Sequence, residues 1–165
     1  GAIHAMIKAR DEKMVRFLGI TGHFDPNVLI EGLNRFNFDA ILMGLNAADS
    51  HFLSFQEKLL PMAVQRNMAI IAMKVPGRGQ VFGPNKTLTM KQALDYVFSK
   101  PISTAIVGCE NIQQIEENVQ IAHDFKPLSN EQLAEIEKLT APYARQASMW
   151  KRGAMPPGQG HDDHD

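Results

Sequence analysis

Four short apolar runs, each followed by a segment with helical periodicity, dominate the pattern of hydrophobic and polar positions along this chain. The runs occupy residues 15–20, 39–45, 69–74 and 102–107. After each run, apolar residues recur at steps of three and four, which places them on one face of a helix. Alternating strands and helices at this spacing predict βαβ units and a parallel sheet.

Capping residues mark where several of these helices begin. Asp25 precedes Pro26, a capping carboxylate followed by proline at the first helical position. Asn111 is the expected N-cap of a helix that starts at Ile112, and Ser129 with Gln132 forms a capping-box pattern before a last helix. An amphipathic helix over residues 2–12 is expected before the first strand.

The pattern alone is compatible with two architectures, an open doubly wound sheet and part of a (β/α)8 barrel. Both gather functional groups at the carboxyl ends of the strands. In this chain those ends are residues 21–23, 46–50, 74–79 and 108–111. We therefore expect the functional site among these segments.

Composition narrows the classes of function. The chain has 165 residues, enough for one domain, and a formal net charge of −1, so nothing indicates a nucleic-acid or membrane partner. The single cysteine, Cys109, excludes an intrachain disulfide and suits a reducing compartment, which favours a cytoplasmic location. Residues 1–150 are expected to form the domain, and the Gly/Pro-rich, then acidic and His-rich residues 151–165 a disordered tail.

Several strand-end residues carry candidate chemistry, each with a structural alternative. The joint between the fourth strand and its helix, at residues 103–118, is a place where a helix N-terminus can bind phosphate, although most such joints bind nothing. Lys74, at a buried strand end, needs either an anionic ligand or a carboxylate partner. His23 either lines the ligand site or satisfies a strand-end hydrogen bond, and Cys109 is either a reactive thiol or a small packing residue.

The glycines of residues 77–83 nearly match the dinucleotide-binding fingerprint, but the third glycine comes one residue late. No helix follows at once. We expect a simple βα loop here. Residues 161–165 have metal-ligating side chains, yet we expect no specific metal site.

Three segments resemble the C-terminal half of an aldo-keto reductase: residues 17–23, residues 70–74, and residues 106–118 with Glu117 and Asn118 at their end. The resemblance covers about residues 3–141. It implies a (β/α)8 barrel of the TIM type, of which strands five to eight are present here and the first four would precede Gly1. It also implies NAD(P)H-dependent reduction of a small carbonyl substrate, with this chain as the cofactor-binding half.

The family's catalytic Asp, Tyr, Lys and His lie on the first half of the barrel, so the resemblance implies that this chain alone is inactive and has no catalytic residue of its own. It does imply a set of cofactor-binding positions on the strand ends, in order along the cofactor from nicotinamide to adenine. They are Thr21, Gly22 and His23 at the carboxamide, Met73 at the nicotinamide ring, Lys74, Gly77 and Arg78 near the pyrophosphate, Gly108, Cys109 and Gln114 at the 2′-phosphate position, and Glu117 and Asn118 at the adenine.

Two questions stay open at this point. Many family members have a Lys and an Arg where this chain has Gly108 and Gln114, so the choice between NADP and NAD is undecided. The second hypothesis is a non-catalytic half-barrel that acts as a nucleotide-binding or self-associating structural protein. Its two unpaired sheet edges would pair with another copy of the chain or with the missing N-terminal half-barrel.

Overall fold

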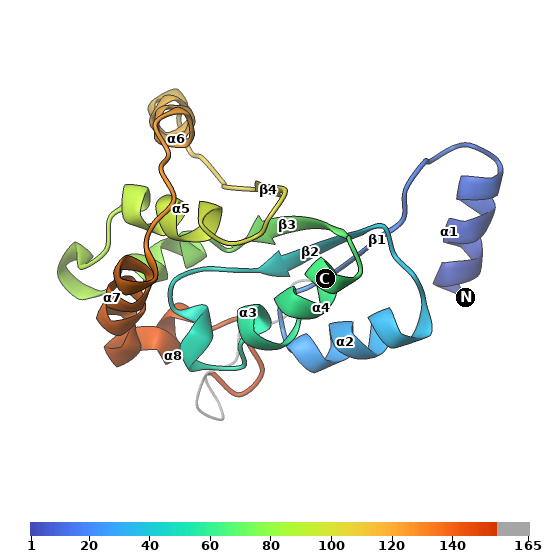
Figure 1. Ribbon diagram of the computed structural model, residues 1–165, viewed down its shortest axis with the longest axis horizontal. Coiled ribbons are helices and arrows are strands. Elements are labelled where there is room, and N and C mark those ends of the chain that lie inside the picture. Colours follow the sequence, from blue (N-terminus) through green and yellow to red (C-terminus); the bar gives the residue numbers. More distant parts are fainter. Residues whose placement is uncertain (155–165) are drawn as a thin grey trace.

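The structure is a computed structural model in which residues 1–154 are described, and its centre is a parallel sheet of four strands with helices between them (Figure 1). The elements are α1 (Ala2–Asp11), β1 (Gly19–Gly22), α2 (Pro26–Arg35), β2 (Ala40–Gly44), η1 (Asp49–His51), α3 (Phe55–Lys58), α4 (Leu60–Gln65), β3 (Ala69–Met73), η2 (Gly77–Phe82), η3 (Pro84–Lys86), α5 (Met90–Phe98), β4 (Thr104–Ala105), α6 (Ile112–His123), α7 (Asn130–Thr140), η4 (Ala141–Tyr143) and α8 (Ala144–Ala147).

The order of the strands separates the two architectures that the sequence pattern left open. The sheet runs β1-β2-β3-β4 with every pair parallel, so each strand lies beside its neighbour in the chain. A doubly wound sheet reverses its order at a switch point, whereas a barrel adds strands in one direction only. The sheet is open, as expected for part of a (β/α)8 barrel, and the predicted fold class is confirmed.

One face of the sheet is covered by helices and forms the core. Ile41, Met43, Ile70 and Ala72 alternate along β2 and β3 and are almost fully buried. They belong to a core that also contains residues of α2, α3, α4 and α5, among them Leu33, Phe55, Ala63 and Leu94. We call this the covered face.

The opposite face of the sheet, here called the open face, is only partly covered within residues 1–154. The register aligns Thr21, Leu42, Ile71 and Thr104 across the four strands. Leu42 and Ile71 are half-buried and the two threonines are exposed. In a closed barrel this face would be the interior, because helices lie outside the strands.

The predicted helix starts are confirmed, and two predicted strands are shorter or shifted. The side chains of Asp25, Asn111 and Ser129 cap α2, α6 and α7, and Ser129 forms the full capping box with Gln132. The first strand begins at Gly19 rather than Val15. The fourth strand pairs only over Thr104–Ala105. The glycine-rich segment after β3 is a loop with short 3-10 turns, as predicted.

The chain after α7 returns to the sheet and crosses the loop that follows β2. We call residues 144–154 the C-terminal strap. Lys151 is buried there, and its Nζ lies 2.5 Å from Oδ1 of Asp49, with both side chains 1% exposed. The predicted start of a disordered tail therefore falls on packed residues, and the packed body extends at least to Ala154. The rest of the predicted tail lies outside the described residues.

Two helices stand off from the sheet. Figure 1 shows α1 at one end of the molecule and α6 beyond β4. The periodic face of α6 that the sequence predicts is present, but Ile112, Ile115 and Val119 are 73%, 51% and 64% exposed. This helix therefore keeps an apolar face that residues 1–154 do not cover.

Candidate functional site

Three side chains meet at Gly44, where β2 ends. A Cβ built on Gly44 would lie 3.7 Å from Nε1 of Trp150, 3.9 Å from Cγ of Lys74 and 4.0 Å from Cβ of His23. Because its neighbour Met43 points to the covered face, the Cβ position of Gly44 points to the open face. Trp150, Lys74 and His23 therefore surround one point at the carboxyl end of the open face.

The site carries a concentration of positive charge. Partial loss of solvation lowers the pKa of His23, and the charges of Lys74 and Arg78 lower it further. Desolvation also lowers the pKa of Lys74, with a second contribution from Arg78. None of the ion pairs found within residues 1–154 involves these three side chains. The site thus has three basic groups without a carboxylate partner in the described structure.

The backbone that holds two of these groups is strained. Lys74 has φ +64° and Arg78 has φ +55°, in the left-handed region that residues other than glycine rarely adopt. The Lys74 carbonyl accepts hydrogen bonds from Asn46 Nδ2 at 3.0 Å and from the backbone N–H of Gly77 at 3.0 Å, which hold the turn. Such strain is often found at functional sites, where the surroundings impose it.

The other predicted nicotinamide-side residues lie on the neighbouring strand ends. Thr21 is on the open face and donates its hydroxyl to the Leu42 carbonyl at 3.1 Å. Gly22 is directed to the covered face, because a Cβ there would lie 3.0 Å from Leu29 of α2. Met73 is paired with Gly44 in the register and is half-buried. Position 22 can therefore offer a ligand only its backbone.

Gly77 lies beside the strap. A Cβ on Gly77 would lie 2.8 Å from Val81 and 3.0 Å from the Trp150 ring, and its φ is +53°. Only glycine fits this position. Since Gly44 contacts the Nε1 edge of the same indole and Gly77 its benzo edge, Trp150 extends from the end of β2 to the loop after β3.

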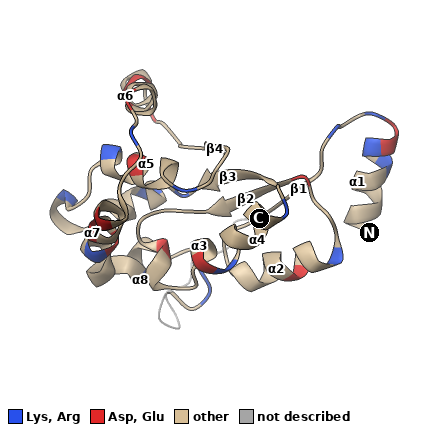
Figure 2. Cartoon of the chain, viewed as in Figure 1, with Lys and Arg blue, Asp and Glu red and all other residues tan. Residues whose placement is uncertain are grey.

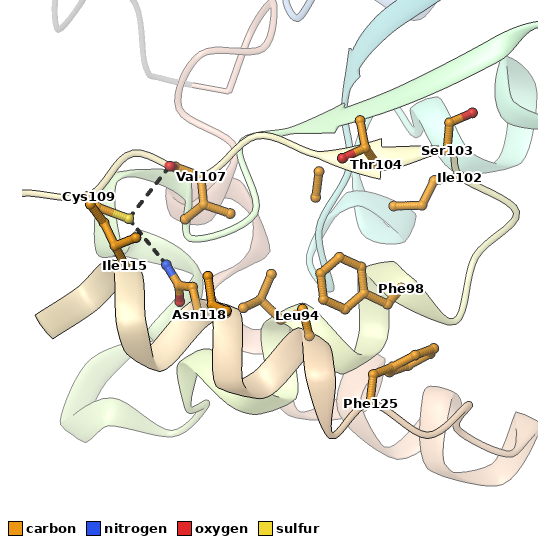
Figure 3. Close-up of a pocket in the computed structure, with 13 residues that line it drawn as sticks. Leu94, Phe98, Ile102, Ser103, Thr104, Val107, Cys109, Ile115, Asn118 and Phe125 are labelled. Atoms are coloured by element: carbon orange, nitrogen blue, oxygen red, sulfur yellow. Dashed lines mark hydrogen bonds between the residues drawn. The ribbon is translucent and has the colours of Figure 1, made fainter. Parts of the chain in front are cut away.

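The predicted adenosine-side residues gather at the start of α6 and form a second group. Asn118 Nδ2 donates to Cys109 Sγ at 3.3 Å, and the thiol donates to the Val107 carbonyl at 3.7 Å (Figure 3). Both side chains line a groove of about 790 Å³ between β4, α5 and α6, whose other walls include Phe98 and Ile115. The thiol has a packing and hydrogen-bonding role here, which favours the structural alternative for Cys109.

The other predicted adenosine-side residues either form hydrogen bonds with residues nearby in the chain or have open space around them. The side chain of Gln114 accepts a hydrogen bond from the backbone N–H of Glu110 at 2.8 Å, so its carbonyl oxygen completes the turn before α6. Glu117 accepts from Gln113 at 2.8 Å and is exposed. Gly108 has open space around it. None of the hydrogen bonds or ion pairs found within residues 1–154 joins this second group to the basic group at Gly44.

Sequence reasoning missed the contribution of the strap. Trp150 and Lys151 lie just before a Gly/Pro-rich segment and belong to no helical or strand periodicity. Their residue types are therefore the only signal that the sequence gives for them. The indole Nε1 of Trp150 is buried without a hydrogen-bond partner in the described structure. The Lys74 ammonium lies 5.6 Å from the centre of its ring, a cation–π arrangement.

The described residues offer neither a metal-ligand cluster nor a membrane-spanning helix. Within residues 1–154 no group of three His, Cys, Asp or Glu side chains is placed to hold a metal ion, and the His-rich residues 161–165 lie outside the described part. Over the same residues, every helix is too short or too polar to span a lipid bilayer. Acidic and basic residues are interspersed along the helices in the view of Figure 2.

Comparison with known proteins identifies the fold. No protein-family model matches the chain, and no curated protein matches it in sequence. Among solved structures, a holo-form aldo-keto reductase from Bacillus halodurans is similar at TM-score 0.68 and 23% identity, over 84% of this chain and 55% of that one. An aldo-keto reductase from Klebsiella pneumoniae in complex with NADPH is similar at TM-score 0.64 and 20% identity, over 84% and 53%.

A glycerol dehydrogenase from Gluconobacter oxydans is also similar, at TM-score 0.62 and 17% identity, over 82% of this chain and 52% of that one. The chain therefore spans about half the length of the solved structures that it matches. The fold is that of part of an aldo-keto reductase barrel. Identities this low establish the fold and leave activity, cofactor and substrate to direct experiment.

Proposed function

We propose that this chain is the cofactor-binding part of an NAD(P)H-dependent oxidoreductase of the aldo-keto reductase type, which reduces small carbonyl substrates. The single observation that carries the proposal is the basic group of His23, Lys74 and Arg78 at the carboxyl ends of the strands. Ligands bind at this end in barrels of parallel strands. Three basic groups without a carboxylate partner suit an anionic ligand such as a dinucleotide pyrophosphate.

The chemistry of reduction would come from elsewhere in the complete barrel. When bound, a nicotinamide cofactor would provide the hydride for the reduction. By resemblance, the Asp, Tyr, Lys and His that act on the carbonyl belong to the first half of the barrel. In this proposal the present chain binds and orients the cofactor, with Thr21 and His23 near the carboxamide, Met73 near the ring, and Lys74 and Arg78 near the phosphates.

The start of α6 would hold the adenosine end of the cofactor. Asn118 and Glu117 would contact the adenine. At the 2′-phosphate position Gly108, Cys109 and Gln114 bring no cation, and the Gln114 oxygen is already occupied by Glu110. We therefore expect only a weak preference for NADP over NAD.

The first test is a calorimetric titration of the chain with NADPH and, separately, NADH. A dissociation constant near the micromolar range, about −8 kcal/mol, is expected for at least one of them. Lys74→Gln should weaken binding by about tenfold or more, because it removes a charged contact. Lys58→Gln, which removes the same charge from an exposed position on α3, is the matched control and should bind like the wild type.

Absence of binding by either cofactor would contradict the proposal for this chain in isolation. The second test supplies an aldo-keto reductase half-barrel that carries the Asp, Tyr, Lys and His, by fusion or by mixing. Aldehyde reduction should appear only with both parts present. A rebuilt barrel that binds cofactor poorly and turns over nothing would overturn the assignment to a reductase.

A second candidate function follows from the open face of the sheet. A half-barrel with this much uncovered strand surface can serve as a nucleotide-binding or self-associating structural protein without any catalysis. Cofactor binding that persists without activity in every rebuilt barrel would favour it.

A further inference from the structure

The loop after β3, residues 74–83, has few contacts of its own that fix its shape. Lys74, Gly77, Arg78 and Gly79 have φ values between +53° and +83°. The backbone hydrogen bonds of the loop are short-range turns, such as the one from the Gly79 N–H to the Pro76 carbonyl at 2.8 Å. Residues other than glycine keep such conformations where the surrounding structure imposes them. Contacts from outside the loop must therefore hold Lys74 and Arg78 in place.

The C-terminal strap and Tyr143, the residue before it, supply contacts of this kind. The Tyr143 hydroxyl donates to the Val81 carbonyl at 3.2 Å, and Gln146 Nε2 donates to Gln80 Oε1 at 3.0 Å. A Cβ built on Gly83 would overlap the ring of Tyr143. The second half of the loop is thus attached to the chain that leads into the strap and to the strap itself.

Trp150 makes the strap contacts that lie nearest to the basic residues. The Lys74 ammonium lies 5.6 Å from the centre of the indole ring. A Cβ built on Gly77 would lie 3.0 Å from Cη2 and 3.1 Å from Cζ3 of the same ring, so the indole packs directly against the Gly77 backbone. The indole therefore contacts both ends of the turn from Lys74 to Gly77, which leads into Arg78.

The end of the strap is attached to the loops after β1 and β2. Lys151 forms the buried ion pair with Asp49. Arg152 forms an ion pair with Asp25 at 2.7 Å, and its backbone N–H donates to the Phe24 carbonyl at 2.9 Å. The strap therefore joins the loops at the carboxyl ends of three neighbouring strands.

We propose that Trp150 is a positioning residue: its ring holds the loop after β3 in the conformation that presents Lys74 and Arg78, so that docking of the strap and anion binding at this loop are coupled. The inference rests on the proposed function for its ligand, the pyrophosphate of a nicotinamide cofactor. Coupling between two sites is reciprocal. Removal of the ring should therefore weaken anion binding, and a bound anion should stabilise the docked strap.

Hydrogen exchange measured by mass spectrometry tests the positioning role without any ligand. Trp150→Ala removes the ring and should raise the exchange rate of amides in residues 74–83 by about tenfold, because the loop opens more often. Amides of β2 and β3 should exchange as in the wild type. Trp150→Phe keeps a ring against Gly77 and should restore most of the protection.

Calorimetric titration with NADPH tests the coupling. Trp150→Ala should weaken binding by about tenfold and Trp150→Phe by less than about threefold. Saturating NADPH should also slow the exchange of residues 144–154 in the wild type, and this protection should be smaller in Trp150→Ala. A residue with a structural role alone would lower the melting temperature and leave the effect of NADPH on the strap unchanged.

Phe38→Ala is the matched control. Phe38 is half-buried like Trp150 and packs edge-on against Phe36, with 4.8 Å between the ring centres. It lies just before β2, at the opposite end of the sheet from the strap. Its loss also removes an aromatic ring, but the exchange of residues 74–83 and the NADPH affinity should equal those of the wild type.

The results distinguish failure of this inference from failure of the proposed function. If the wild type binds NADPH and Trp150→Ala binds it equally well, or if Phe38→Ala weakens binding as much as Trp150→Ala, the inference is wrong and the proposed function stands. If the wild type binds neither NADPH nor inorganic pyrophosphate, the proposed function fails for the isolated chain. Exchange then decides the inference: faster exchange of residues 74–83 in Trp150→Ala supports the positioning role, and unchanged exchange overturns it.

Discussion

At the scale of single residues, the site combines positive charge with backbone strain. Lys74 and Arg78 occupy left-handed conformations that cost roughly 1–2 kcal/mol for a residue with a Cβ. Glycine would avoid that cost, as it does at Gly77 and Gly79 of the same loop. The presence of cations at strained positions favours a binding role over a structural one.

Arg78→Gly tests this balance between stability and binding. Glycine relieves the left-handed strain but loses about 0.5–1 kcal/mol through the greater freedom of the unfolded chain. The free energy of unfolding should therefore stay the same or rise by up to about 1 kcal/mol, measured by urea denaturation. NADPH affinity should fall by about tenfold or more. Arg78→Lys, which keeps the charge, should lose less affinity. A clear loss of stability in Arg78→Gly would show that the arginine has a structural role.

The lowered pKa of His23 predicts how stability depends on pH. The folded protein binds the His23 proton less tightly than the unfolded chain, whose pKa is 6.5. Unfolding therefore takes up a proton in the window between the lowered pKa and 6.5, and stability rises with pH across that window.

His23→Gln removes the loss of stability that protonation of His23 causes at low pH. It should be more stable than the wild type at pH 5, and the difference should shrink by pH 8, as measured by urea midpoints. His4→Gln on α1 is the control and should follow the wild type at both pH values. A difference between His23→Gln and wild type that is the same at pH 5 and pH 8 would contradict the prediction.

At the scale of secondary-structure elements, the buried ion pair determines whether the strap stays on the sheet. Lys151→Met leaves Asp49 buried without its cation, although Ser54 and the Gln56 backbone still donate to that carboxylate. Breaking one partner of a buried pair costs about 3–5 kcal/mol. The urea midpoint should fall accordingly, and Trp150 emission should shift to longer wavelength because the indole becomes more exposed.

Lys138→Met on the exposed surface of α7 is the control for this experiment. It removes the same charge and should change neither the midpoint nor the emission. An unchanged emission maximum in Lys151→Met would mean that the strap holds its position without the ion pair.

At this scale the sequence predicts the features that depend on residues close together in the chain, such as where helices begin. Asn111 and Ser129 cap helices through contacts three residues away, so their signal is visible in the sequence. Trp150 contacts Gly44 and Gly77, which are far from it in the chain. The pattern of hydrophobic and polar residues does not predict such contacts. Val15 is predicted in a strand from its side-chain type, but it is 41% exposed and the pairing of β1 with β2 begins only at Gly19. The sequence predicts His23 and Lys74 as site candidates, but it gives no signal that Trp150 lies beside them.

At the scale of the whole molecule, the open face and the edges of β1 and β4 are the surface on which assembly would occur. Parallel strands are normally covered on both faces, and an unpaired edge invites pairing with another chain. Within residues 1–154, β1 and β4 each have a neighbour on one side only. We therefore expect the chain to self-associate through this face, and sedimentation at micromolar concentration should show a dimer or larger species.

Substitutions on the two faces distinguish this interface from nonspecific association. Leu42→Lys and Ile71→Lys place charges in the middle of the open face, where the side chains are half-buried and a lysine can extend into water. Each should shift sedimentation to the monomer while the far-ultraviolet circular dichroism stays that of the wild type. Val28→Lys on α2, at a position 66% exposed outside the sheet, should leave the assembly unchanged. A sharp monomer mass for the wild type would contradict self-association, and a monomer produced by Val28→Lys as well would place the interface on the helices instead.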